Sequence, residues 1–170
     1  VEEADSNFHA RFSAYERSYV YLIKVGEIRS TFLRNYVYHV SKPIDLKLLS
    51  KELKGIIGTH DFSAFRSSQC SAKDPVKTIS KASFEERDNL ICIEFSANAF
   101  LHNMIRILIG TLVEISTNAD SEYTITDIIS SKNRALAGKT APANGLYFLG
   151  AKYKDIQNTN IPFKKFFDSL

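Results

Sequence analysis

Arg106 raises the clearest chemical question in the sequence. Its neighbours along the chain are large and apolar: Met104, Ile105, Ile107 and Leu108. An unpaired buried guanidinium is strongly destabilising, so a carboxylate or a phosphate is expected to reach Arg106. Glu114 lies two turns further along the same predicted helix and cannot be that partner. In the alternative interpretation, Arg106 extends along the edge of the helix to water.

Two other segments interleave basic and aromatic side chains. They are residues 8–19, with Arg11 and Arg17, and residues 62–66, with Arg66. Arginine for phosphate and an aromatic face for an unstacked base are typical of proteins that hold single-stranded or flipped RNA. The alternative is that the aromatic rings belong to the core and the arginines are solvated. A net charge of only +3 does not decide against that alternative.

Other catalytic chemistries find little support. No two histidines have a metal-ligand spacing with a third ligand nearby. The motifs GxSxG, GxGxxG and GxxxxGK[ST] are absent. His60 and Asp61 could form an acid–base pair, but we interpret Asp61 as the cap of a short helical turn that follows a loop. We therefore predict neither a metal nor a cofactor.

The composition is that of one globular domain. The 170 residues include 22 Lys plus Arg and 19 Asp plus Glu, and 44% are hydrophobic, which excludes disordered, collagen-like and coiled-coil chains. No apolar run is long enough to cross a membrane, and the first residues lack a signal-peptide pattern. The two distant cysteines, Cys70 and Cys92, favour a reducing compartment. Because the sequence begins with Val1, we expect a piece of a longer protein.

The hydrophobic patterns predict elements that must position these residues. Strands are predicted at 17–25, 35–39, 77–86, 90–96 and 146–153. Helices are predicted at 44–53, 100–115 and 123–132. Asp88-Asn89 is the predicted hairpin turn. This order predicts an α+β fold, a mostly antiparallel sheet covered by helices. The tail, 157–170, is expected to dock through Phe163, Phe166 and Phe167, or else to form a self-association patch.

Four ordered segments resemble the C-terminal half of the tRNA pseudouridine synthase A (TruA) family. They are Phe8-His-Ala-Arg-Phe-Ser-Ala14 with Arg17-x-Tyr19-x-Tyr21, Gly58-x-His-Asp-Phe-x-x-Phe65-Arg66, Asn98-Ala-Phe-Leu-His-Asn-Met-Ile-Arg106 with Gly110-Thr-Leu112, and Thr140-Ala-Pro-Ala-x-Gly-Leu-Tyr147. Each segment alone is a weak signal, whereas four in order across almost the whole chain are specific.

The resemblance implies a cofactor-free, homodimeric isomerase that converts uridine to pseudouridine in the anticodon arm of tRNA, usually at positions 38 to 40. The target nucleotide is flipped into a cleft, as chemistry on a base requires. An aspartate attacks it, and the base is detached, rotated and rejoined through carbon.

The resemblance also assigns roles to residues of this chain. It implies that Tyr19 stacks on the target uridine and that its phenol is a candidate for the final proton transfer. Arg106 would be the partner of the catalytic aspartate, and Leu146 would close the pocket beneath the base. Contacts with the RNA are implied for Arg11, Arg17, Arg66 and His102.

The sequence departs from the family in one respect. The family's nucleophile belongs to an Arg-Thr-Asp segment of the N-terminal half, and these 170 residues contain no Arg-Thr-Asp. We therefore expect residues 1–170 to be a single domain, the C-terminal half of a longer cytoplasmic enzyme, inactive and self-associating when alone. The alternatives are a stand-alone, non-catalytic tRNA-binding module and a purely structural or interaction domain.

Overall fold

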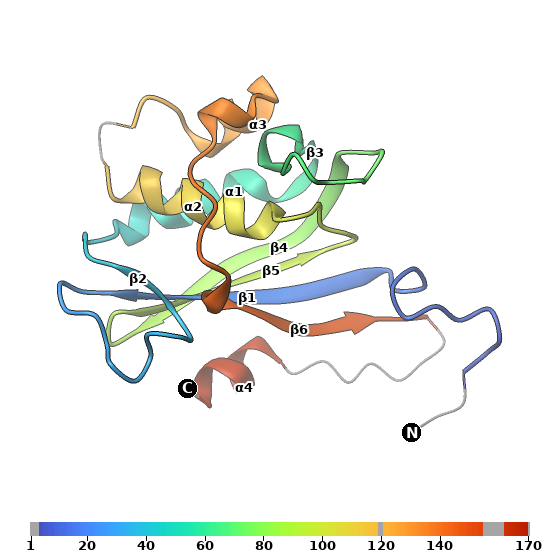
Figure 1. Cartoon of the computed structure of the whole chain (residues 1–170), viewed down its shortest axis with the longest axis horizontal. Coiled ribbons are helices and arrows are strands. Elements are labelled where there is room, and N and C mark those ends of the chain that lie inside the picture. Colours follow the sequence, from blue (N-terminus) through green and yellow to red (C-terminus); the bar gives the residue numbers. More distant parts are fainter. Residues whose placement is uncertain (1–3, 119–120, 155–161, 170) are drawn as a thin grey trace.

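Helices and a twisted sheet form the layers of the chain (Figure 1). The structure, a computed structural model, describes residues 4–118, 121–154 and 162–169. Within these residues six strands form one sheet in the order β2-β1-β5-β4-β3, with β6 also paired to β1. Only the β1–β2 pairing is parallel. The predicted α+β class with a mostly antiparallel sheet is confirmed.

The strand β1 pairs with three of the other strands, β2, β5 and β6. The strands are β1 (Glu16–Val25), β2 (Tyr38–Val40), β3 (Gly58–Asp61), β4 (Val76–Arg87), β5 (Leu90–Ala97) and β6 (Leu146–Lys152). β4 and β5 form the predicted hairpin, and Asp88 and Asn89 at its turn both have positive φ values, of 53° and 61°. That conformation suits a two-residue turn whose twist matches the flanking strands.

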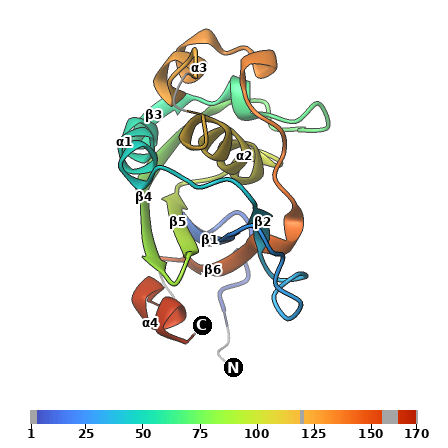
Figure 2. The same ribbon diagram turned by 90° about the vertical axis from the view of Figure 1, so that its left-hand side faces the viewer.

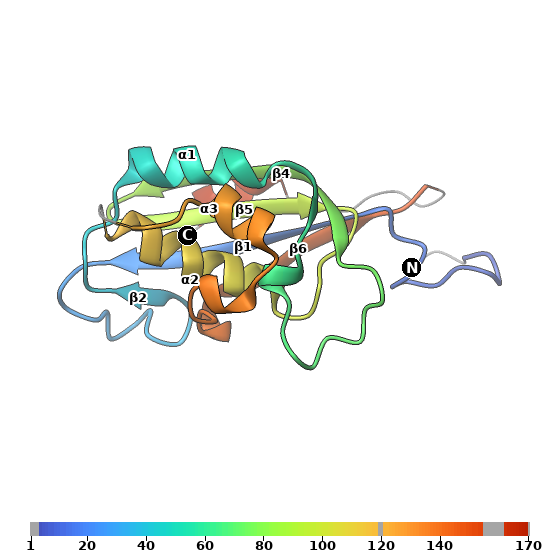
Figure 3. The same ribbon diagram turned by 90° about the horizontal axis from the view of Figure 1, so that it is seen from above.

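Among the described residues, two helices cover one face of the sheet, a third packs on the outer side of these two, and a fourth covers the other face (Figures 2 and 3). They are α1 (Leu46–Ile56) and α2 (Met104–Ser116) on the first face, α3 (Ile125–Ser131) outside them, and α4 (Phe163–Asp168) on the second face. Asp45 caps α1 by accepting from two backbone N–H groups, and Thr124 with Asp127 forms a capping box on α3. These polar side chains satisfy N–H groups that have no partner within the helix.

Alternation along β1 divides the core in two. Tyr21 and Ile23 face the cluster beneath α1, α2 and α3, whereas Val20 and Leu22 face the smaller cluster beneath α4. Phe167 of α4 is buried there. The predicted docking of the tail is thus confirmed for residues 162–169, and residues 157–161 and 170 lie outside the described residues.

Several details of the predicted elements are wrong. The strand predicted at 35–39 lies at 38–40, and a turn precedes it. Residues 58–61, predicted as a loop, form the edge strand β3 against β4. The central helix starts at Met104 rather than at residue 100, because Asn103 takes a left-handed conformation with φ 61°. The N-cap of the short helical turn at 63–65 is Phe62 rather than the predicted Asp61. Asp61 lies one residue earlier, and its carboxylate accepts from the backbone N–H of Ser63 at 2.9 Å.

Candidate functional site

An open cleft of about 610 Å³ gathers most of the candidate residues from distant parts of the sequence. It is lined by Arg11, Tyr19, residues 69–72, residues 100–106 and Leu146. Five of the seven candidates therefore share one cavity: Arg11, Tyr19, His102, Arg106 and Leu146. Arg17 and Arg66 do not line it.

β1 holds Tyr19 between two neighbouring strands. Its backbone pairs with Phe95 of β5 on one side and with Phe148 of β6 on the other. The centre of its ring lies 5.5 Å from the centre of the Phe100 ring, which it meets edge-on, and 5.2 Å from the centre of the Phe148 ring. Partial burial raises the pKa of the Tyr19 phenol above its ordinary value of 10, although Arg17 opposes that rise. The phenol is therefore protonated at neutral pH.

The first turn of α2 fixes Arg106 at the cleft. Its Nε donates to the backbone oxygen of Ala141 at 2.7 Å, and its Nη1 donates to the side-chain oxygen of Asn103 at 3.2 Å. Both acceptors are neutral, and the ion pairs of the described residues do not include Arg106. The half-buried guanidinium therefore keeps its full charge at the cleft wall and can bind an anion there.

Residues 138–141 pack along α2 and bring Leu146 to the same cleft. Gly138 N–H donates to Thr111, Lys139 N–H donates to Glu114, and Ala141 N–H donates to the carbonyl of Arg106. Gly110 permits this contact, because a Cβ there would lie 1.7 Å from the Lys139 carbonyl oxygen. As expected, Glu114 is not the partner of Arg106.

The chain continues from this segment into β6, which Leu146 begins. The hydroxyl of the fully buried Tyr21 donates to the carbonyl of Pro142 at 2.5 Å. Leu146 then pairs with Tyr21 at the start of β6. Two of the sequence segments that carry the family resemblance thus meet at Arg106 and Leu146.

Three of the four remaining candidates, Arg17, Arg66 and His102, form hydrogen bonds within the chain. The Arg17 guanidinium donates to the carbonyls of Arg11, Ala14 and Asn98. Arg66 donates to the carbonyl of Cys70 at 2.8 Å. The His102 Nδ1 lies 3.0 Å from the Ser67 hydroxyl. These bonds position the cleft walls, and the RNA contacts predicted for these side chains stay predictions.

Several lining residues were not candidates in the sequence. Asn103 orients Arg106, and Phe100 supports Tyr19. Cys70 also lines the cleft. Burial would raise the pKa of the Cys70 thiol, but hydrogen bonds from the His102 and Ala72 backbone, together with Arg66, hold that pKa below its usual value. The Asn98–Arg106 segment held the signal for the first two, whereas nothing in the sequence marked Cys70.

Neither a clustered metal site nor a spanning helix is found in the described part of the chain. Over residues 4–118, 121–154 and 162–169, no three His, Cys, Asp or Glu side chains come together as a set that could hold a metal ion. Among the helices of those residues, none is long and apolar enough to cross a bilayer.

Comparison with known proteins points to one family. Residues 53–154 match the sequence profile of the family described as tRNA pseudouridine synthase. The chain is similar to the tRNA pseudouridine synthase A of Geobacillus sp. (strain WCH70), with 42% identity over 153 residues that cover 90% of this chain and 62% of that protein.

Two further relatives carry the same name. The protein of Acetivibrio thermocellus is 43% identical over 152 residues, which are 89% of this chain and 62% of the relative. The protein of Ehrlichia canis is 44% identical over 154 residues, which are 90% and 62%. The match thus spans about 62% of the length of these relatives.

Proposed function

Because the chain belongs to the tRNA pseudouridine synthase family, we propose that it is part of an enzyme that converts uridine to pseudouridine in tRNA. The proposed target lies in the anticodon stem–loop, in the region of positions 38–40. In this enzyme the chain forms the tRNA-facing surface and one wall of the active-site cleft. The observation that carries this proposal is the convergence of Tyr19, Arg106 and Leu146 on one cleft.

In this proposal the target nucleotide leaves its stack and enters the cleft. The ring of Tyr19 lies against the uracil, and Leu146 closes the apolar side of the pocket. Arg106 holds the carboxylate of a nucleophilic aspartate supplied by the rest of the enzyme. The N1–C1′ bond breaks, the uracil turns, and a C5–C1′ bond forms. The proton on C5 leaves and N1 gains one, so the net reaction is an isomerisation.

The 170-residue chain alone is proposed to lack turnover. It has no Arg-Thr-Asp segment, and Arg106 bonds to neutral acceptors within the described residues. Release of tritium from tRNA that carries 5-tritiated uridine measures the reaction directly. We expect turnover by the protein expressed from its complete reading frame and none by these 170 residues. Turnover by the 170 residues would overturn this proposal.

The second candidate function is a stand-alone module that binds tRNA without catalysis, and the missing Arg-Thr-Asp favours it. Reading the frame upstream of the codon for Val1 separates the two functions. An Arg-Thr-Asp segment within roughly a domain's length supports the enzyme, and its absence supports the module. Both require salt-dependent binding of tRNA, because arginine–phosphate contacts release counterions.

We also propose that the full protein is a homodimer in the cytoplasm and that the isolated chain self-associates. Among the described strands, β6 pairs only with β1, and Phe148 on β6 is 59% exposed. An exposed edge with apolar side chains promotes association. Light scattering over a range of concentrations should show a mass above that of the monomer. A monomer mass at every concentration would contradict self-association.

A further inference from the structure

The loop formed by residues 8–14 is tightly folded although it lies at the surface. The Nδ1 of His9 accepts from the backbone N–H groups of Arg11 and Phe12, at 3.1 and 3.4 Å. The carbonyl of His9 accepts from the N–H groups of Phe12 and Ser13, at 3.0 and 2.8 Å. The N–H of His9 donates to the Ser13 hydroxyl at 2.9 Å. One histidine therefore organises the whole turn.

The same loop is fastened to the sheet at several points. The guanidinium of Arg17 joins it to the end of β5 by donating to the carbonyls of Arg11, Ala14 and Asn98. The Tyr153 hydroxyl donates to the carbonyl of Ala10 at 2.8 Å, and the Tyr153 ring meets Phe8 edge-on at 5.1 Å. The loop is therefore held in place beside the cleft, which Arg11 lines.

This fixed loop presents the ring of Phe12 to solvent. Phe12 is 73% exposed. The Arg11 guanidinium carbon lies 5.5 Å from the centre of the ring, and the His9 ring lies 4.4 Å from it. The alternative in which the interleaved aromatics belong to the core is therefore wrong for Phe12. A large apolar ring that is exposed to water beside a cation can accept a flat stacking partner.

We propose that the Phe12 ring is a stacking platform for a nucleobase that flanks the flipped nucleotide, with Arg11 at its phosphate. This inference rests on the proposed function. Flipping the target removes a stacking partner from its neighbour, which then needs another aromatic face. Because the loop is already ordered, little conformational entropy is lost when the base stacks. A nucleobase fits better than a protein segment, since Arg11 supplies a cation beside the ring and also lines the cleft.

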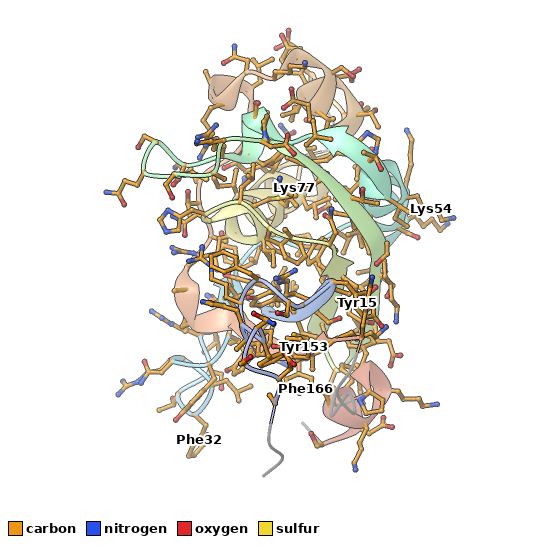
Figure 4. All side chains as sticks on the ribbon, turned by 90° about the vertical axis from the view of Figure 1, so that its right-hand side faces the viewer. Tyr15, Phe32, Lys54, Lys77, Tyr153 and Phe166 are labelled. Carbon is orange, nitrogen blue, oxygen red and sulfur yellow. The ribbon has the colours of Figure 1, made fainter. Side chains whose placement is uncertain are left out.

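The absence of tryptophan from the chain permits a direct test. Phe12→Trp places a single fluorophore at the platform, and Phe32→Trp provides a matched control. Phe32 is 90% exposed and projects from the loop between β1 and β2 (Figure 4). That loop follows the far end of β1, whose ten residues span about 30 Å. Each variant of the 170-residue chain is titrated with an anticodon stem–loop RNA, and anisotropy of the labelled RNA reports binding independently.

We expect the tryptophan emission of the Phe12→Trp variant to be red-shifted in the free chain and strongly quenched by the RNA, and that of the Phe32→Trp variant to be unchanged. An RNA with an abasic site next to the target uridine should bind Phe12→Trp without quenching its emission. If the intact RNA binds and this emission is not quenched, the platform is refuted and the proposed function stands. If the wild-type chain shows no binding, both fail. If the emission of Phe12→Trp is blue-shifted in the free chain and does not change when RNA is added, polypeptide covers the ring. That result also refutes the platform.

A second variant measures what the aromatic face contributes. Phe12→Leu keeps an apolar side chain and removes the flat ring. We expect it to weaken binding of the intact stem–loop about tenfold and to leave binding of the abasic RNA unchanged. Equal weakening for both RNAs would indicate a merely structural role for Phe12 and would overturn the inference.

Discussion

Arg106 shows how a charged residue can occupy a largely apolar helix. Its two hydrogen bonds go to an amide oxygen of Asn103 and to the backbone oxygen of Ala141, and neither neutralises the guanidinium. These bonds orient the planar group, and the neutral acceptors leave its charge for an anion. A group held in this way is prepared for a carboxylate that arrives from elsewhere in the protein.

Arg106→Ala should therefore affect turnover more than affinity. In the protein from its complete reading frame, we expect turnover to fall by about a hundredfold or more, because the interaction stabilises charge at the reacting centre. Affinity for tRNA should change little. Tritium release and filter binding measure the two quantities, and Arg29→Ala, on the distant loop, is the control. Unchanged turnover would contradict the ion-pair role.

Tyr19→Phe separates two roles of one side chain. The variant keeps the ring, which contacts Phe100 and Phe148, and removes the hydroxyl. Because burial raises the pKa of that phenol, it is protonated at neutral pH and available for proton transfer. We expect tRNA affinity to be retained and the rate of pseudouridine formation to fall in single-turnover assays. A rate equal to that of the wild type would limit Tyr19 to stacking.

At the scale of elements, the sequence predicted the main strands and helices, but not where α2 begins or how the connecting segments pack against it. The strands around Tyr19 and the β4–β5 turn follow from alternation and from Asp88-Asn89. The start of α2 does not, because Phe100 and Leu101 extend the apolar pattern ahead of the helix, which begins only after the left-handed Asn103. Nor could periodicity show that residues 138–141 bond along α2, since those contacts depend on the tertiary approach at Gly110.

The Arg17 side chain connects the N-terminal loop to the sheet through its hydrogen bonds to the carbonyls of Arg11, Ala14 and Asn98. Arg17→Lys keeps the charge but loses the planar fork that reaches three carbonyls. We expect faster hydrogen exchange at the N–H groups of Phe12 and Ser13, and a free energy of unfolding lower by about 1–3 kcal/mol. Arg29→Lys, whose arginine donates to the carbonyl of Arg34, is the matched control. Unchanged exchange at Phe12 would show that the fold of the loop does not depend on the Arg17 guanidinium.

The whole molecule buries one sheet between two apolar layers, and this burial brings ionisable groups into the core. Tyr21 is fully buried, and burial raises its pKa well above 10. Burial, with Glu85 and Glu94, raises the pKa of the Cys92 thiol to about 12. Both groups are neutral when protonated, so the folded chain retains protons that the unfolded chain releases at lower pH.

Stability should consequently fall as the pH rises above about 9, where the unfolded state begins to lose its thiol proton and then its phenol protons. Since the folded state then binds more protons, each such group lowers the free energy of unfolding by up to about 1.4 kcal/mol per pH unit until its folded pKa is reached. Urea unfolding between about pH 7 and pH 11 measures how the free energy of unfolding depends on pH.

Two variants assign this decline to its groups. Cys92→Ala should delay the decline towards pH 10, and Tyr21→Phe should make it shallower above pH 10, although losing the bond to Pro142 lowers stability at neutral pH. A constant free energy of unfolding over this range would contradict the burial of both groups, because an exposed phenol or thiol titrates alike in the folded and unfolded chains.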